Sequence, residues 1–178
     1  MNPPKIKNYK QLLGKIKTLI FDVDGVLTNG FFQIASDGEQ LRTMYVKDGY
    51  ALQLAVKKGY RVAILSGGRS NVLTERFKYL GVTDVFLAVN NKMDCFSKYV
   101  QDNNLDKSEI LYMGDDIPDY KVMSNVSVPC CPADAAEEIK SLSLYISPYD
   151  GGRGCVRDII EQVMKVHGKW FDDEAHHW

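Results

Sequence analysis

The sequence predicts one doubly wound α/β domain, in which helices cover both faces of a parallel β-sheet. Short, continuous apolar runs alternate with helical patterns along most of the chain. Strands that are apolar on both faces are typical of parallel sheets covered by helices. The length of 178 residues suits a single domain with a sizeable core. We therefore expect one domain over residues 16–168, an N-terminal extension over residues 1–15 and a polar C-terminal tail over residues 169–178.

The composition is that of an ordinary globular protein. Hydrophobic residues make up 45% of the chain and charged residues 25%, which argues against disorder and against a fibrous or membrane-spanning chain. A formal net charge of −1 gives no general attraction to nucleic acid or to an anionic membrane. The start of the chain lacks the apolar run of a secretory signal, and the four cysteines form no C-x-x-C spacing. We expect a cytoplasmic protein with free thiols that binds neither nucleic acid nor a membrane.

The apolar runs place the expected elements in order along the chain. Each expected strand is a short apolar run, and each expected helix fills the interval to the next run. The strands are expected over residues 18–22, 61–66, 85–89, 109–113 and 126–130, with a weaker one over residues 144–147. The helices are expected over residues 50–57, 71–80, 92–103, 119–124, 133–142 and 156–166.

One segment departs from the alternation of strands and helices. Residues 31–34 and 40–46 flank Ser36-Asp37-Gly38-Glu39, in which Asp-Gly is typical of a hairpin turn. A β-hairpin over residues 31–46 is therefore predicted to project after the first strand. It carries more apolar surface than a solvated excursion should, so we expect it to pack on another surface, and a second subunit is a fair candidate. The apolar residues concerned are Phe31, Phe32, Leu41, Met44 and Tyr45.

An acidic turn follows the first expected strand in the run Leu19-Ile20-Phe21-Asp22-Val23-Asp24-Gly25-Val26-Leu27-Thr28. Because side chains alternate along a strand, Asp22 and Asp24 point to the same side. Like charges so close repel each other unless a cation lies between them. Magnesium prefers oxygen ligands, often takes one or two carboxylates, and leaves positions for water and a substrate phosphate. The run therefore predicts a magnesium site and phosphoryl chemistry.

Other polar clusters also follow expected strands. Ser66-Gly67-Gly68-Arg69 follows the second strand, Lys92 follows the third, and Gly114-Asp115-Asp116-Ile117-Pro118-Asp119 follows the fourth. In open parallel sheets the ligand crevice lies outside the carboxyl ends of the strands. Taken singly, each cluster has an ordinary structural explanation as a turn, a helix cap or a surface lysine. Their order along the chain is far more specific than any one of them.

These elements, in this order, resemble the motifs of the haloacid dehalogenase superfamily, which includes many phosphatases. The resemblance covers about residues 17–166 and implies a Rossmann-like fold. It implies that Asp22 is the nucleophile and that Asp24 is the general acid and base. It also implies that Ser66 hydrogen-bonds the phosphoryl oxygens and that Lys92 neutralises charge. Physical reasoning agrees, because a carboxylate can attack phosphorus only if its repulsion from a phosphate dianion is cancelled.

The same resemblance implies the magnesium ligands. Asp115 would complete a set with the Asp22 carboxylate and the backbone carbonyl of Asp24. Asp116 and Asp119 are expected beside this set, one holding a metal-bound water and the other capping the following helix. Backbone N–H groups of the helix after Ser66 are expected to face the same anion.

Two further segments resemble a narrower group, the 3-deoxy-D-manno-octulosonate 8-phosphate phosphatases. They are Lys47-Asp48-Gly49-Tyr50 and Gly151-Gly152-Arg153-Gly154-Cys155-Val156-Arg157. The group lacks a cap domain, and the intervals from Asp24 to Ser66 and from Ser66 to Lys92 leave no room for one. The resemblance implies a homotetramer whose hairpins meet at its centre, with the tail of one subunit reaching a neighbour's site. It places Asp48 and Arg153 among the substrate-binding residues, and the planar fork of an arginine suits a carboxylate.

The residues after the second strand bear on the substrate. Octulosonate phosphatases usually carry Thr-Gly-Arg there, and the related nonulosonate 9-phosphate enzymes carry Glu after the glycine. This chain has Ser66-Gly67-Gly68-Arg69, so the arginine is displaced by one residue and no acid follows the glycine. We expect Gly67 and Arg69 near the substrate and favour the eight-carbon acid. The implied function is magnesium-dependent hydrolysis of 3-deoxy-D-manno-octulosonate 8-phosphate through an aspartyl-phosphate, in bacterial lipopolysaccharide synthesis.

Three other functions are compatible with parts of the pattern. The first is a phosphatase for a nonulosonate 9-phosphate, and the second is a non-catalytic assembly module of the same fold. The third is a signalling receiver domain, which also gathers acids, a hydroxyl and a lysine around magnesium. The intact set of Asp22, Asp24, Lys92 and Asp115 favours an enzyme over an assembly module. Receivers gather their extra acids early in the chain, whereas here the Gly114-Asp115-Asp116 cluster lies late.

Overall fold

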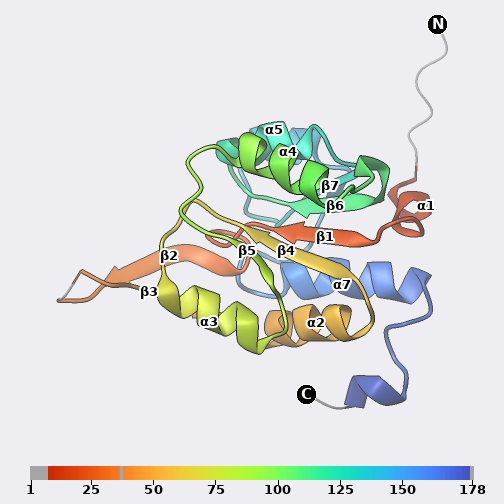
Figure 1. Ribbon diagram of the computed structural model, residues 1–178, viewed down its shortest axis with the longest axis horizontal. Coiled ribbons are helices and arrows are strands. Elements are labelled where there is room, and N and C mark those ends of the chain that lie inside the picture. Colours follow the sequence, from red (N-terminus) through yellow and green to blue (C-terminus); the bar gives the residue numbers. More distant parts are fainter. Residues whose placement is uncertain (1–7, 37, 177–178) are drawn as a thin grey trace, which may run out of the picture.

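A parallel sheet of six strands forms the centre of the molecule (Figure 1). The computed structural model describes residues 8–36 and 38–176. The strands are β1 (Thr18–Phe21), β4 (Arg61–Leu65), β5 (Asp84–Phe86), β6 (Ile110–Met113), β7 (Val128–Cys131) and β8 (Tyr145–Ile146). Their order is β5-β4-β1-β6-β7-β8, and each pair of neighbours runs parallel. The chain runs outward on one side of β1 and then returns to its other side, so the predicted doubly wound fold is confirmed.

Helices cover both faces of the sheet (Figure 1). On one face lie α2 (Val46–Lys57), α3 (Asn71–Tyr79) and α7 (Cys155–Val166), with the short α1 (Tyr9–Leu13) beside α7. On the other lie α4 (Lys92–Asp102), α5 (Tyr120–Met123) and α6 (Glu137–Leu142). Short 3₁₀ turns occur at Lys107–Glu109, Ile117–Asp119 and Asp173–His176. Each helix layer closes its own apolar cluster over the sheet.

The central strands are apolar on both faces because each face has its own helix layer. In β1, Leu19 and Phe21 belong to the cluster under α2, α3 and α7, whereas Ile20 belongs to the cluster under α4, α5 and α6. β6 divides in the same way, with Leu111 on the first side and Tyr112 on the second. Alternation of side chains along a strand produces this division. The burial explains why these strands are continuous apolar runs in the sequence.

The predicted hairpin is present and forms a separate antiparallel pair, β2 (Thr28–Ile34) with β3 (Gln40–Met44). It projects from the body of the molecule (Figure 1). The predicted turn residue Asp37 lies outside the described residues. Phe31 is 78% exposed and Ile34 is 74% exposed, so the apolar surface of the hairpin is open within the chain.

Some element ends differ from the sequence prediction because the backbone bonds elsewhere. α6 begins at Glu137 rather than near residue 133, since the N–H of Ala133 bonds the Tyr149 carbonyl and the N–H of Ala136 bonds the Asp115 carbonyl. β5 ends at Phe86, two residues before Ala88 takes a positive φ. α2 begins at Val46, earlier than the expected residue 50.

Both ends of the described chain, which belong to the expected extension and tail, pack on the domain. Leu13 of α1 is fully buried, and the Tyr9 ring stacks on Tyr145. At the other end Trp170 is only 8% exposed, and the guanidinium of Arg157 lies 5.0 Å from the centre of its ring. Residues 1–7 of the expected extension and 177–178 of the expected tail lie outside the described residues. The apolar face of each short segment accounts for its docking.

Two findings bear on the expected environment of the protein. All four cysteines are free, and Cys130, Cys131 and Cys155 are buried. Within residues 8–36 and 38–176, none of the helices has both the length and the apolar character needed to span a bilayer.

Candidate active site

An open cavity of about 730 Å³ lies at the carboxyl ends of β1, β4 and β6. This is the edge at which doubly wound sheets bind ligands. The cavity brings together side chains from the four sequence clusters that follow different strands. The predicted site residues that line it are Asp22, Asp24, Ser66, Gly67, Lys92, Asp115, Asp116 and Asp119.

A buried ion-pair network occupies the floor of the cavity. The Nζ of Lys92 lies 3.0 Å from Asp22 Oδ1 and 2.7 Å from Asp119 Oδ1, and all three side chains are buried. The Tyr112 hydroxyl donates to Asp119 Oδ1 at 2.5 Å, and the backbone N–H of Asp115 donates to Asp119 Oδ2 at 3.3 Å. Both oxygens of Asp119 therefore have donors. Asp119 holds Lys92 beside Asp22, which the sequence did not suggest.

The network carries more negative than positive charge. Carboxylate oxygens of Asp22, Asp115 and Asp119 all lie within 4.8 Å of one another. Burial, followed by the nearby Asp119 charge, raises the pKa of Asp22 in spite of Lys92. Burial, then the charges of Asp22 and Asp119, raises the pKa of Asp115 to about 8. Burial lowers the pKa of Lys92, but the two carboxylates outweigh it and the net shift is upward.

These residues fit a divalent cation. Because Asp119 already accepts from Lys92 and Tyr112, the carboxylates of Asp22 and Asp115 are the ones that can turn to an ion, and magnesium often takes one or two carboxylates. Gly25, at φ +90°, makes the approach possible, because a Cβ built there would lie 2.0 Å from Asp115 Oδ2. The loop that carries Asp24 can thus come against Asp115 only with glycine at position 25.

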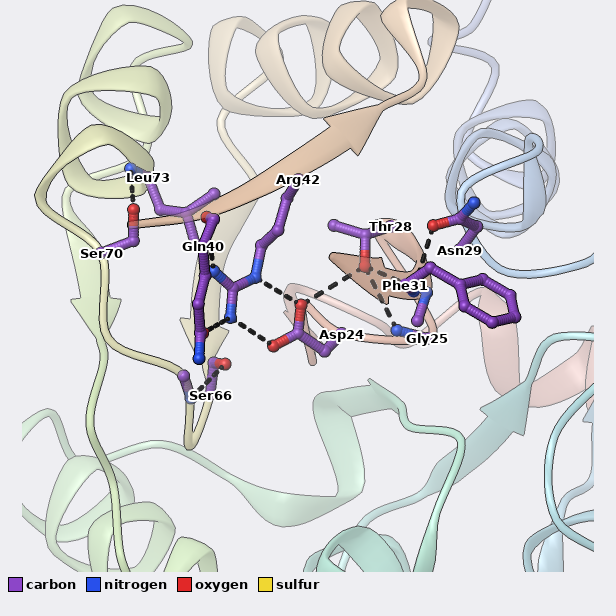
Figure 2. Close-up of polar contacts among 12 residues, drawn as sticks. Asp24, Gly25, Thr28, Asn29, Phe31, Gln40, Arg42, Ser66, Ser70 and Leu73 are labelled. Atoms are coloured by element: carbon purple, nitrogen blue, oxygen red, sulfur yellow. Dashed lines mark hydrogen bonds and ion pairs between the residues drawn. The ribbon is translucent and has the colours of Figure 1, made fainter. Parts of the chain in front are cut away.

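The Asp24 side chain turns toward the hairpin and pairs with Arg42 of β3 (Figure 2). Arg42 Nε lies 2.7 Å from Asp24 Oδ1, and Arg42 Nη2 lies 3.0 Å from Asp24 Oδ2. The Arg42 side chain is only 4% exposed, so this bidentate pair is part of the site wall. Sequence reasoning missed Arg42. The sequence signal was weak, because Arg42 lies in a mixed strand in which Gln40 and Thr43 are also polar.

The loop after β4 supplies the side of the cavity facing Asp24. Ser66 is buried, and its Oγ accepts a hydrogen bond from the Gly68 N–H at 3.1 Å. The hydroxyl proton of Ser66 therefore remains available to a ligand. α3 begins only at Asn71, and the Ser70 side chain accepts from the N–H of Leu73. The expected helix N-terminus is thus already capped, and Gly67 and Gly68 line the cavity in its place.

Two predicted substrate-binding residues lie beside the cavity rather than on it. Arg69 lines an adjoining hollow of about 630 Å³ with Gln40, Gly67 and Gly68. Arg153 is exposed and lines a smaller hollow of about 370 Å³ with Asn29, Thr43, Tyr45 and Gly152. Neither arginine lines the cavity of its own chain that holds Asp22.

The structure does not bring Asp48, the third of these residues, to the cavity. Asp48 is 1% exposed and accepts hydrogen bonds from the N–H groups of Gly154 at 3.2 Å and Arg157 at 2.7 Å. It therefore satisfies the N-terminus of α7. Burial raises the pKa of Asp48 to about 6 against these two hydrogen bonds.

The glycine-rich segment before α7 packs against the loop after β1, which carries Asp24 in the same chain. The Gly152 N–H donates to the Val26 carbonyl at 2.9 Å. A Cβ built on Gly151 would lie 1.9 Å from the Gly25 carbonyl oxygen. The two backbones are therefore in direct contact, which gives these glycines a structural role next to Asp24.

The comparisons with known proteins point in one direction, although no protein-family model matches the chain. The chain is 33% identical to the 3-deoxy-D-manno-octulosonate 8-phosphate phosphatase KdsC of Escherichia coli K12 over 160 residues, which are 90% of this chain and 84% of that protein. A solved structure of the Moraxella catarrhalis phosphatase of that name, in complex with magnesium ion, phosphate ion and KDO, matches with a TM-score of 0.85 and 29% identity, covering 88% of this chain and 90% of that one. A putative haloacid dehalogenase superfamily (subfamily III A) hydrolase from Legionella pneumophila matches with a TM-score of 0.88 and 29% identity, covering 92% and 90%.

The fold, the convergent acids and lysine, and these relatives together define a phosphatase of the haloacid dehalogenase superfamily, which is a phosphomonoester hydrolase. Within that superfamily, the chain belongs to the family of KdsC, the 3-deoxy-D-manno-octulosonate 8-phosphate phosphatases.

Proposed function

We propose that the protein hydrolyses the terminal phosphate of 3-deoxy-D-manno-octulosonate 8-phosphate, with Asp22 as the nucleophile and Mg²⁺ as the cofactor. The observation that carries the proposal is the buried Asp22 beside Lys92, with Asp115 and Asp119 oxygens within 4.8 Å. The relatives named for this substrate, and the neighbouring structure with magnesium, phosphate and KDO, support the substrate and the metal. We expect the reaction to take place in the cytoplasm and to serve lipopolysaccharide synthesis.

In the proposed first step, the Asp22 carboxylate attacks phosphorus and forms an aspartyl-phosphate. Lys92 offsets the charge of the nucleophile and the phosphoryl group, and the Ser66 hydroxyl donates to a phosphoryl oxygen. Asp24 gives its proton to the ester oxygen as the P–O bond breaks. It then takes a proton from the water that hydrolyses the aspartyl-phosphate.

A bound Mg²⁺ would neutralise the charge that gathers between the carboxylates and the phosphoryl oxygens. Asp22, Asp115 and the backbone carbonyl of Asp24 would hold it, with Asp116 and Asp119 in support. Burial is the largest cause of the raised pKa of Asp115, and the charges of Asp22 and Asp119 add to it. A cation held between these carboxylates would offset the repulsion that they contribute.

The rest of the substrate would lie toward the hairpin and the loop after β4. The hollow lined by Gly67 and Arg69 adjoins the main cavity and gives space for a sugar acid. Among the described residues between Asp24 and Ser66, the structure has only the hairpin, α2 and β4, so we propose a capless site. We further propose a homotetramer formed through the hairpins, in which the C-terminal part of a neighbour, with Arg153, closes this open site. The exposed Phe31 and Ile34 support that assembly.

The test is phosphate release by the purified protein from the octulosonate 8-phosphate, a nonulosonate 9-phosphate and a generic aryl phosphate, with Mg²⁺ and after chelation. We expect a clear preference for the eight-carbon acid, and loss of activity on chelation that added Mg²⁺ restores. Asp22→Asn should lower kcat by at least about 1000-fold with an unchanged unfolding midpoint. Asp102→Asn, at an exposed position on α4, is the matched control. A preference for the nine-carbon acid would contradict the substrate, and an active Asp22→Asn would contradict the nucleophile.

A further inference from the structure

Arg42 links the hairpin to the catalytic loop, and the reaction proposed above gives it no role. Its guanidinium is held in place by the hairpin itself. Nη2 lies 3.0 Å from Gln40 Oε1, and Nη1 lies 3.2 Å from the Gln40 carbonyl oxygen. The Phe32 ring, on the residue paired with Arg42 across the hairpin, lies 5.6 Å from the guanidinium carbon. These contacts fix the direction of the fork before any ligand binds.

The Asp24 carboxylate depends on this fork for its orientation. The other side-chain contact seen for it within the described residues is the Thr28 hydroxyl at 3.4 Å from Oδ1, a long and weak bond (Figure 2). Asp24 is also partly exposed, with 35% of its side chain open to solvent. Without Arg42, a carboxylate with so little other support would rotate toward the solvent. Two parallel N–H···O bonds from one guanidinium remove that freedom.

The ion pair of Asp24 and Arg42 lies next to Gly68, between the cavity that holds Asp22 and the adjoining hollow. Gly68 lies directly against it, because a Cβ built on Gly68 would be 3.0 Å from Asp24 Oδ2 and 3.1 Å from Arg42 Nη2. Gly67 and Gly68 line both the cavity that holds Asp22 and the adjoining hollow. A phosphoryl group beside Asp22 and Lys92 would therefore direct its ester oxygen toward Asp24 and the rest of the substrate past the ion pair.

We propose that Arg42 is a positioning residue that aims the Asp24 carboxyl at the ester oxygen, which makes the exposed hairpin part of the catalytic machinery. The proposal rests on the proposed phosphatase mechanism. In that mechanism the Asp22–phosphorus bond forms and the phosphorus–ester oxygen bond breaks, while the proton of Asp24 moves to the departing oxygen. In the second half water attacks phosphorus, its proton returns to Asp24, and Asp22 is released. Arg42 itself exchanges no proton and forms no bond to phosphorus.

The decisive measurement compares the rates at which the Arg42→Gln variant and the wild type hydrolyse two phosphate esters. An alkyl phosphate needs a proton on its leaving oxygen, whereas p-nitrophenolate leaves without one. We expect kcat for the alkyl ester to fall by about 10- to 100-fold, below the full value of a general acid, with KM nearly unchanged. Release of p-nitrophenolate in the first turnover should fall by less than about threefold. Arg42→Lys, which keeps the charge but not the fork, should restore only part of the loss.

Controls separate positioning from damage to the fold. Arg61→Gln removes an arginine that also pairs with a carboxylate, Asp84, but at the opposite end of β4. This change should lower the hydrolysis rates of the two esters only slightly and by the same factor. In an Asp24→Asn background, Arg42→Gln should cause no further loss, because a residue that acts through Asp24 has nothing left to position. Equal losses on both esters, or an additional loss in the Asp24→Asn background, would overturn the proposal.

A second readout does not depend on activity. In the metal-free protein, the Nε–H resonance of Arg42 should be distinct from those of solvent-exposed arginines by NMR. Asp24→Asn should move it toward them, while the resonance of Arg61 stays in place. If Asp24→Asn left the Arg42 resonance unchanged, the result would contradict the ion pair between Arg42 and Asp24. The proposed function fails by other results, namely a wild-type protein that releases no phosphate or an active Asp22→Asn.

Discussion

The two sides of the catalytic cavity are held in place in different ways. On the side where the proposed mechanism places the phosphoryl group, Asp22, Lys92 and Asp119 are buried and extend from the central sheet and the 3₁₀ turn and helix that flank it. On the side proposed for the leaving group, Asp24 is held by Arg42 from a two-stranded hairpin whose apolar side chains face outward. The first side is fixed by the core, whereas the second is fixed by one ion pair. Two strands alone are marginally stable, so in the proposed mechanism the position of the general acid depends on how well the hairpin is held.

The largest expected effect in this comparison comes from the core side. Lys92→Met should lower kcat/KM by about 100- to 1000-fold for every phosphate ester, because the charge that offsets the nucleophile and the phosphoryl group is lost. Steady-state kinetics with good and poor leaving groups checks this. Lys98→Met is the control, since Lys98 is an exposed lysine of the same helix that pairs with Asp102. If kcat/KM fell by less than about tenfold, or only for esters with poor leaving groups, the result would contradict the distinction between the two sides.

The next effect concerns stability, at a carboxylate that the core buries for structure alone. Burial raises the pKa of Asp48 to about 6, well above the ordinary value of an aspartate, so the folded state binds the proton more tightly. The stability that its protonation contributes is fully present below the unfolded pKa and is lost as the pH rises through the folded pKa. From pH 4 to pH 7 the wild type should therefore lose up to about 3 kcal/mol relative to Asp48→Asn, which does not titrate.

Urea unfolding of both proteins at several pH values measures this difference. Asp102→Asn, an exposed change, should stay within about 0.5 kcal/mol of the wild type throughout. A pH-independent gap between the wild type and Asp48→Asn would show that burial does not dominate at this position.

The smallest effect on the folded chain is expected on the hairpin. Phe31→Ser combined with Ile34→Ser should change the free energy of unfolding of the chain by no more than about 0.5 kcal/mol per site, because both side chains are exposed. The same double change should dissociate the proposed tetramer, as light scattering would show. Gln33→Ser, at a polar position of the same strand next to Ile34, is the control. A tetramer that survives the double change would place the interface elsewhere.

Much of the fold and of the core side of the cavity was predictable from the sequence. Buried strands such as β1 and β6 are apolar on both faces, and an element of that kind leaves a continuous run in the sequence. The acids and the lysine closely follow such runs. Because ligands bind at the carboxyl ends of parallel strands, the sequence alone was enough to group Asp22, Lys92 and Asp115. Their catalytic roles stay predictions.

The rest depended on tertiary relations that leave no local pattern. Arg42 meets Asp24 only because the hairpin folds back over the loop after β1, and the sequence does not say which face of a hairpin turns inward. Asp48 precedes a glycine and resembles a surface acid, yet the start of α7 covers it. Trp170 lies in a polar stretch, and its ring is buried only because Arg157 and neighbouring apolar side chains provide a surface for it.

The contact between Gly151 and Gly25 limits which sequences this part of the chain can accept. All other amino acids place a carbon where the Gly25 carbonyl oxygen already lies, so a missense change at codon 151 would displace the peptide next to Asp24 whatever its polarity. A saturation library selected for activity should therefore contain almost no substitutions at this codon, although Gly151 is more than 120 positions from Asp24 in the chain. Tolerance to variation is thus set here by the space between two peptide backbones.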